Sequence, residues 1–486
     1  MWLQCIQYRR FHISYGIFAC SVGILAGLLV GRIVLSSVLL LVLAISAAIL
    51  VGGALRSMRW WSLIIICLAG LMLGISRSSY IYQELNTYKP LIGNNQIVSG
   101  AVASDPTIVS ESKQRIELVN IELVDGKSYP GKVFLTVNDS INVKRGDRVV
   151  AEGILRGGFG SYQATLSVQQ LDSVKRPKDI IRDVREKFGE SVRSVVIEPM
   201  ASLGLGFVVG QRSALPASLD EQLKIVGLTH IVVASGYNLT ILVRFITRVM
   251  SKQSRFMILT TSLTVIGLFA AFSGFSPSMN RAVLVTVLGL LAWYVGRRFH
   301  PVHLLAFVAA ITSLVNPTYI YSDLGWYLSF FAFAGVLIVA PLILRLLYKN
   351  REPSAPVQLV TETIGAELMA LPLIAFSFGM LPVFGLIANV LVAPLVPFAM
   401  ALITIAGIIA MASSTLAGIF GYAANILIGY MVAVIEQLSS IEYAALTINV
   451  GIAELVVWYM LITAFCSIAA HKTRYNFRSR SISSEL

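Results

Sequence analysis

Apolar runs of about twenty residues recur through most of the chain, and that is the length an α-helix needs to cross a lipid bilayer. Of the 486 residues 56% are hydrophobic, which exceeds the usage of an average soluble domain. A polar stretch between residues 84 and 176 interrupts these runs. The pattern predicts a polytopic α-helical membrane protein with a soluble domain inserted between its helices.

We expect about 12 transmembrane helices, three before the soluble stretch within residues 1–80 and nine after it. Basic residues such as Arg9, Arg56 and Arg297 cluster at alternate helix ends, and the positive-inside rule places them in the cytoplasm. Both termini are then cytoplasmic, and the soluble domain lies outside the cytoplasmic (inner) membrane. The predicted spans are 13–31, 33–54, 60–76, 222–248, 256–273, 280–296, 302–315, 324–344, 357–378, 383–412, 415–437 and 447–470.

The soluble stretch, residues 81–177, alternates polar and apolar residues in five runs separated by turn-forming residues. A Lys144-Arg145-Gly146-Asp147 turn before a strand, with Gly153 inside that strand, indicates an OB-like β-barrel of about five strands. Such a barrel can bind nucleic acid or dock another protein. We favour docking, because eleven basic residues face ten acidic ones between residues 84 and 176 and the few aromatic residues do not alternate with the basic ones.

Residues 178–200 carry Ile181, Val184, Phe188 and Val192 at helical spacing, which predicts an amphipathic helix at the membrane interface or against the barrel. The apolar run that follows is too short to span, so a re-entrant segment is expected there. Residues 201–470 form the polytopic domain. Residues 471–486 form a basic cytoplasmic tail.

Polar groups concentrate in GLTHIVVASGYNLTIL, residues 227–242. On one helix, His230, Tyr237 and Asn238 would share a face, and Ser235 and Gly236 beside it would permit close helix approach or a local break. Polar groups are costly in a bilayer and usually line a path. We predict that these five residues line a channel; interhelical hydrogen bonds are the alternative.

Arg281 opens a predicted span, where its charge opposes the helix dipole, so it is expected to bind an anionic group unless it reaches the outer headgroups. Trp326 stands at another span's start, as an interface aromatic or a platform for a base. Both are predicted to line the channel.

Glu367 is a carboxylate in the middle of a span, which indicates a proton or ion site, or pairing with His230 or Arg281. Asn389, followed by Pro394, marks an interrupted helix of the kind that surrounds substrate paths in transporters. These two residues complete the predicted channel lining.

No catalytic set stands out. Ser235 and His230 are five residues apart and out of phase on one helix, and no phosphate-binding loop of the P-loop type occurs. His300 and His303 have metal-like spacing, but they flank Pro301 at a helix entry, where an interfacial role is favoured. We therefore predict a protein that is not an enzyme, with no metal and no cofactor.

Four short motifs occur once each and in a fixed order between residues 227 and 394, within a resemblance that covers about residues 10–470: Gly-x-x-His followed by Ser-Gly, Ser-x-x-Arg-Ala, Asn-Pro before Gly-x-x-Leu-Ser-Phe, and Ala-x-Leu…Leu-Pro…Asn…Pro. The residues are Gly227, His230, Ser235, Gly236, Ser278, Arg281, Ala282, Asn316, Pro317, Gly325, Leu328, Ser329, Phe330, Ala366, Leu368, Leu371, Pro372, Asn389 and Pro394. In this order the chain resembles the ComEC/Rec2 family of competence DNA-uptake channels. It departs from the family at Tyr237-Asn238, where Leu-His is usual.

The resemblance implies an inner-membrane channel that passes single-stranded DNA into the cytoplasm during natural transformation, with Arg281, Arg212 and Arg77 as cations at its outer mouth. Implied partners are a cytoplasmic DNA translocase or helicase, an external DNA receptor and the lipid bilayer, with a homo-oligomer left open. No C-terminal metallo-β-lactamase-like domain follows, so a separate nuclease is expected. Alternatives are a proton-coupled secondary transporter of a small or lipid-linked solute, and a membrane scaffold.

Overall fold

The computed structural model describes residues 12–473 apart from several gaps. The gaps are 32–38, 40–41, 44, 48, 50, 53–59, 105, 111–112, 124–125, 138–142, 159–161, 211–214, 233–235, 275–276, 297–299 and 350–352. The chain forms two compact units, the first from residues 1–178 and 299–327, the second from residues 179–298 and 328–486. The predicted span 33–54 falls mostly outside the described residues.

Glycines bring the first two described helices of unit 1 into backbone contact. Helix α2 (Ile13–Val30) packs along α4 (Ser62–Asn86). A Cβ atom added to Gly23 would lie 2.0 Å from the carbonyl oxygen of Cys67, and one on Gly74 would lie 2.3 Å from that of Ile24. Gly23 and Gly27 of α2, with Gly31 at its C-cap, and Gly70 and Gly74 of α4 repeat every four residues, the spacing that lets membrane helices approach closely.

Helix α12 (Pro301–Val315) lies against α2, and Arg77 joins its end to α4. The Arg77 guanidinium donates to the carbonyl oxygens of Leu314 at 2.8 Å and Val315 at 3.2 Å. A cation at a helix C-terminus complements the helix dipole. Short α13 (Tyr319–Ser322) follows, and its Tyr321 hydroxyl contacts Ser78 and the Leu28 carbonyl.

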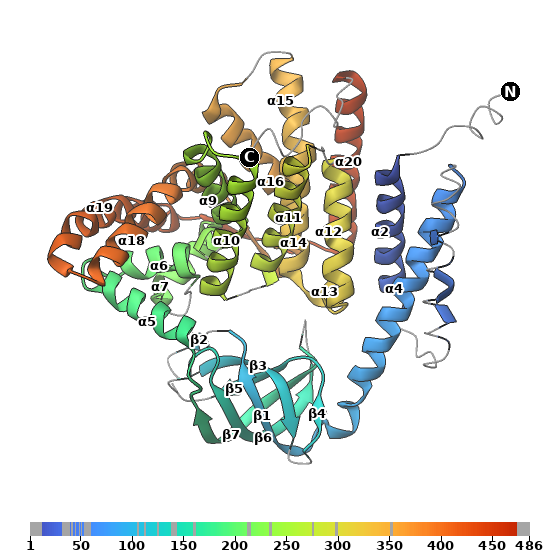
Figure 1. Ribbon diagram of the computed structural model, residues 1–486, viewed down its shortest axis with the longest axis horizontal. Coiled ribbons are helices and arrows are strands. Elements are labelled where there is room, and N and C mark those ends of the chain that lie inside the picture. The colour runs from blue at the N-terminus through green and yellow to red at the C-terminus, as the bar shows by residue number, and fades with distance from the viewer. Residues whose placement is uncertain are drawn as a thin grey trace. The chain divides into compact units, whose positions relative to one another are not determined.

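The soluble stretch forms a closed barrel, shown in Figure 1. A 3₁₀ turn, η1 (Lys89–Leu91), leads into it. The strands are β1 (Asn95–Val102), β2 (Thr107–Ser110), β3 (Lys113–Leu123), β4 (Ser128–Tyr129), β5 (Val133–Val137), β6 (Arg148–Gly157) and β7 (Ala164–Lys175). Their order is β1-β6-β7-β5-β3, closed by β1 on β3, and β5 runs parallel to β7. This is the OB topology, so all five predicted strands are confirmed.

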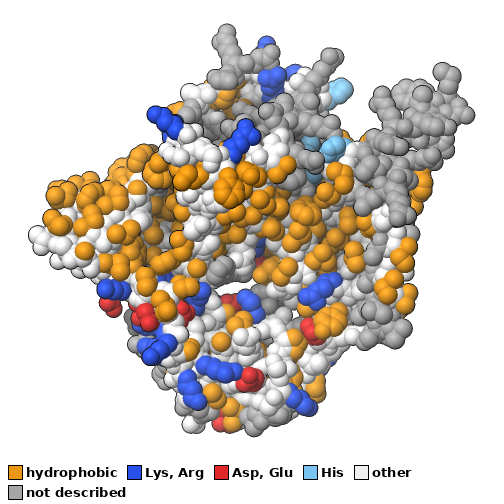
Figure 2. All heavy atoms as spheres, viewed as in Figure 1, with side chains coloured by type: hydrophobic (Ala, Val, Ile, Leu, Met, Phe, Trp, Pro, Cys, Tyr) orange, Lys and Arg blue, Asp and Glu red, His pale blue; other side chains and the backbone are white. Residues whose placement is uncertain are grey.

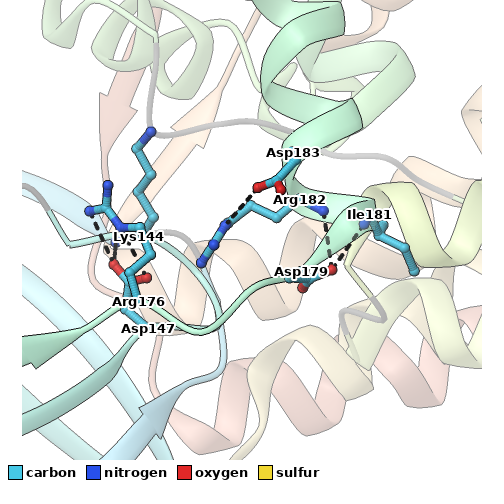
Figure 3. A network of polar contacts seen from close by, with 7 residues as sticks. All are labelled: Lys144, Asp147, Arg176, Asp179, Ile181, Arg182 and Asp183. Carbon is cyan, nitrogen blue, oxygen red and sulfur yellow. Dashed lines mark hydrogen bonds and ion pairs between the residues drawn. The ribbon is translucent and has the colours of Figure 1, made fainter.

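A buried carboxylate fixes the predicted barrel corner, seen in Figure 3. Asp147 has no exposed surface, accepts the Lys144 backbone N–H at 2.9 Å and pairs with Arg176 at 3.3 Å. Gly146 adopts φ +85°, which a residue with a side chain rarely does. Gly153 lies where the β6–β7 register shifts, and a Cβ there would meet the Ser167 carbonyl oxygen at 2.1 Å.

Unit 2 is helical. Its elements are α5 (Ile180–Arg193), α6 (Met200–Val209), α7 (Ala217–Ile225), α8 (Thr229–Val232), α9 (Gly236–Val249), α10 (Arg255–Ser273), α11 (Pro277–Tyr294), the π-helix η3 (Gly335–Val339), α15 (Ala340–Tyr348), α16 (Ala355–Phe378), α17 (Gly385–Val392), the 3₁₀ turn η4 (Ala393–Leu395), α18 (Val396–Ala410), α19 (Ser414–Ser439) and α20 (Ile452–Thr473). Helix α14 (Leu324–Ala334) begins in unit 1 and continues into unit 2.

The amphipathic helix exists as α5, capped by Asp179, whose carboxylate accepts the N–H groups of Ile181 and Arg182 (Figure 3). Its C-terminal half packs on α18, where Phe188 and Val192 fill the space left by Gly407. Ile181 and Val184 instead remain 46% and 39% exposed. Placement of this helix at a membrane interface stays a prediction.

Eight helices among the described residues are long and apolar enough to cross a membrane, and α6, α11 and α12 are shorter apolar helices. The protein is therefore a membrane protein. Figure 2 shows hydrophobic side chains spread over the outer face of the helices, while charged side chains lie on the barrel and at the upper end of the helices. Exposed apolar surface of this kind suits helices solvated by lipid.

The predicted single span over 222–248 is wrong. Helix α7 ends before Gly227, whose φ of +72° belongs to the left-handed region, and α8 starts after it, so the predicted span is broken at this glycine. This break precedes both His230 and Asn238, and residues 233–235 between them lie outside the described residues, so the shared face of His230, Tyr237 and Asn238 stays a prediction.

A small antiparallel ribbon joins two loops of unit 2. Strand β8 (Met380–Pro382), after α16, pairs with β9 (Ala445–Thr447), before α20. The charge-based topology requires these two loops on the same side of the membrane, and the pairing satisfies that requirement.

Candidate functional site

Two of the predicted channel residues meet in unit 2. Asn389 of α17 donates from Nδ2 to Oε1 of Glu367 on α16 at 3.3 Å, and Asn389 is buried. The sequence suggested His230 or Arg281 as the partner of Glu367, and the hydrogen bond goes instead to Asn389. An amide donor lowers the cost of a carboxylate among apolar helices, because the carboxylate would otherwise have an unsatisfied oxygen.

Two glycines beside this pair allow the α7–α8 turn, residues 226–228, to pack against the start of α17. A Cβ on Gly385 would lie 3.7 Å from both Glu367 Oε1 and the Val226 carbonyl oxygen, and one on Gly227 would lie 3.0 Å from Pro382. His230 contacts this turn, because its Nδ1 lies 3.1 Å from the Gly227 carbonyl oxygen. The α7–α8 turn therefore contacts the Glu367–Asn389 region, and His230 contacts that turn.

Asn238 holds the end of the short apolar helix α6. Its side chain is fully buried, and Nδ2 donates to the Phe207 carbonyl oxygen at 3.1 Å. Arg185 of α5 donates to the Val209 carbonyl oxygen at 3.5 Å. The carbonyl groups at the C-terminal end of a helix lack intrahelical hydrogen-bond donors, and these two side chains provide donors to two of them. Helix α6, at ten residues, fits the expected short segment that does not span.

Gly236 permits the close helix approach that the sequence predicted. A Cβ there would stand 3.0 Å from the Cβ of Ala282, so α9 begins in tight contact with α11. The neighbouring Arg281 is only 3% exposed, and this burial argues against a guanidinium that reaches the headgroups. Ser235 and the side chain of Tyr237 lie outside the described residues.

Trp326 belongs to unit 1, where it is 5% exposed. Its Nε1 donates to Thr312 Oγ1 at 3.1 Å, and its backbone N–H is capped by Asp323 Oδ1 at 2.9 Å. Stacking of a base on Trp326 would require the ring to leave this site. Its assignment to a channel lining, like that of the other predicted residues, stays a prediction.

Helix irregularities accumulate around Glu367. The π-helix crosses α16 where Gly335 meets Gly365, since a Cβ on Gly335 would lie 2.1 Å from the Gly365 carbonyl oxygen. Pro372 lies inside the continuous helix α16, and the 3₁₀ turn η4 separates α17 from α18. The interrupted helix predicted at Asn389 is thus confirmed, whereas the π-helix had no sequence signal. Such irregularities are frequent at functional sites.

The barrel gathers aromatic and basic groups that are distant in sequence. The Phe134 and Tyr162 rings are 4.8 Å apart, and the Arg115 guanidinium lies 5.7 Å above Phe134. Burial, then the Glu117 carboxylate, raises the pKa of Tyr162. The two rings are tilted by 49° to one another and do not form a flat stacking platform, so the choice between nucleic-acid binding and docking stays a prediction.

His300 and His303 stack at 4.5 Å, and His303 also contacts the rings of Tyr15 and Phe18. Through the part of the chain that the structure describes, no three His, Cys, Asp or Glu side chains gather in a way that could hold a metal ion.

Comparison with known proteins identifies the family to which the chain belongs. Residues 207–473 match the competence protein family, which covers every predicted channel residue and confirms the resemblance. A protein of Aquifex aeolicus (strain VF5), named only as uncharacterized, is 27% identical over 278 residues. The match covers 57% of this chain and 61% of that relative, less than two thirds of its length. No solved structure matches.

Proposed function

Because the chain belongs to the competence protein family, whose members serve DNA uptake in transformation, we propose that it is a channel carrying single-stranded DNA across the cytoplasmic membrane into the cell. The observation that carries this proposal is the set of polar side chains in the matched helices: Asn238, Arg281 and Asn389 are buried, and Asn389 bonds to the partly buried Glu367. Polar side chains among apolar helices lower the stability of a membrane protein, so they are kept mainly where they have a function.

A strand of DNA carries a negative charge at every phosphate, so its path must offer polar groups and few acidic ones. Arg281 supplies a cation, and the amides supply hydrogen-bond donors. Glu367 is the exception, and its bond to Asn389 engages one carboxylate oxygen. An external DNA receptor would deliver the DNA, and a nuclease on another protein would degrade the complementary strand. A cytoplasmic translocase or helicase would then pull the remaining strand through the channel.

Transformation of a strain that lacks the native gene tests the proposal. We expect His230→Ala and Arg281→Ala each to lower transformation at unchanged membrane abundance, because these residues line the path. Gly267→Ala is the matched control, since a Cβ there meets no atom within 4 Å. Loss of uptake only in proportion to loss of protein would contradict the proposal and leave these residues as packing elements.

One observation favours a second candidate, a proton-coupled secondary transporter. Glu367 lies beside interrupted helices, as coupling carboxylates do in such transporters. In that case Glu367 would exchange a proton in each cycle, and an amide in its place would stop transport.

A further inference from the structure

Pro372 leaves α16 with an unsatisfied carbonyl one turn earlier. Proline has no N–H, so the carbonyl of residue i−4, here Leu368, lacks its usual intrahelical donor. Inside a membrane domain such a carbonyl must find another donor, because water is not at hand.

Helix α20 supplies donors to this turn of α16. Trp458 Nε1 donates to the Leu368 carbonyl oxygen at 3.2 Å, and the Tyr459 hydroxyl donates to the next carbonyl, that of Met369, at 2.9 Å. Two consecutive side chains thus serve two consecutive carbonyls. The Tyr459 ring also stacks on Phe331 of α14 with centroids 4.9 Å apart, which fixes the direction of its hydroxyl.

Helix α20 makes these contacts although most of its residues are exposed. Only 6% of its span is buried, and its main neighbours are α15 and α16. Tryptophan and tyrosine in a membrane helix usually mark the lipid headgroup level. Here both reach the backbone of a neighbouring helix instead, so an anchoring role alone does not explain them.

Glu367 immediately precedes Leu368, and on its other side α16 is held where Gly365 meets Gly335. We propose that Trp458 and Tyr459 are positioning residues, which hold the turn of α16 at Pro372 so that Glu367 reaches Asn389. The importance of this placement for transport rests on the proposed function. The placement itself does not.

The proline provides a test by suppression. In Pro372→Ala the new backbone N–H can donate to the Leu368 carbonyl, so the Trp458 indole becomes dispensable there. The positioning role therefore predicts that Trp458→Phe is harmful when Pro372 is present and harmless in the Pro372→Ala background. A role in packing or in lipid anchoring predicts the same effect in both backgrounds.

Position is measured directly by cross-linking Glu367→Cys to Asn389→Cys with a short bifunctional thiol reagent, in a protein whose native cysteines are replaced. We expect Trp458→Phe and Tyr459→Phe each to lower the yield by about five-fold, the effect of one lost hydrogen bond. Pro372→Ala with Trp458→Phe should match Pro372→Ala alone. Thr463→Val is the control, because that hydroxyl bonds within α20, to the Tyr459 carbonyl oxygen.

A Trp458→Phe protein that cross-links like the parent, or whose defect persists in the Pro372→Ala background, would overturn the inference. Transformation by the same single variants, with Glu367 and Asn389 intact, separates this inference from the proposed function. A changed cross-link yield with unchanged DNA uptake would uphold the positioning role and contradict its importance for DNA uptake. An unchanged yield would refute the positioning role whatever the uptake.

Discussion

Asn389 donates a hydrogen bond to Glu367 at 3.3 Å, which joins α17 to α16. Asn389 lies shortly before the 3₁₀ turn η4, and Glu367 lies five residues before Pro372. This pair separates the two transport hypotheses. A strand pulled from the cytoplasm needs only a hydrogen-bonding side chain at residue 367, whereas a proton-coupled carrier needs an ionisable one.

The channel proposal predicts that Glu367→Gln keeps most DNA uptake and even eases passage of the polyanion, because it removes one negative charge. Uptake of labelled DNA should be compared in wild type and variant at matched expression, with and without a protonophore. Abolished uptake in a variant of unchanged stability would favour the proton-coupled transporter.

The topology is predicted from charge. A cysteine introduced at Ser110, in the barrel, should react with a membrane-impermeant thiol reagent in intact cells, and one at Ser483 should not. The parent protein gives the background from its native cysteines. Reaction at Ser483 would overturn the cytoplasmic placement of the tail.

Glycine contacts should control the pairing of α2 with α4. Gly74→Ala would drive a methyl group to 2.3 Å from the Ile24 carbonyl oxygen, and overpacking of this kind costs about 1–3 kcal/mol. Thermal unfolding in detergent should show a lower midpoint. Gly267→Ala, in open space within α10, should raise the midpoint or leave it unchanged, and equal effects of the two substitutions would refute the packing argument.

Barrel stability should fall at alkaline pH. Burial, with Tyr129 adding to it, raises the pKa of Tyr88. The folded barrel then retains a proton that the unfolded chain loses above about pH 10, so stability is full below that pH and declines above it. Hydrogen exchange of barrel peptides in the whole protein, compared at pH 8 and pH 10.5 after correction for intrinsic rates, measures this.

Tyr88→Phe should weaken the barrel at both pH values, because it loses the bond to the Pro130 carbonyl oxygen, and should reduce the alkaline decline. Peptides from α10 are the internal control. An undiminished decline in the variant would assign the effect to other groups.

The barrel strands and most helices were predictable because their signals are local. Alternation along β1, β3, β5, β6 and β7 and long apolar runs both follow from which faces are buried. The break at Gly227 was missed, because a glycine within an apolar run signals a possible interruption only when the surrounding packing is known. The glycine spacing that pairs α2 with α4 was present and could have been used.

The partners of the site residues were not predictable. Glu367 could have met His230, Arg281 or Asn389, and only the packing of α17 on α16 selects the last. Likewise, the contacts of Trp458 and Tyr459 with α16 join residues 90 positions apart, beyond the reach of any local pattern.

Reconstitution tests the central claim most directly. Liposomes that contain the purified protein and a trapped single-strand-binding protein should accumulate a labelled single-stranded oligonucleotide. The amount should be well above that in liposomes with the trapped protein alone, and a protonophore should not change it. Liposomes that exclude the oligonucleotide, yet take up a small solute in a protonophore-sensitive way, would contradict the channel and establish the transporter.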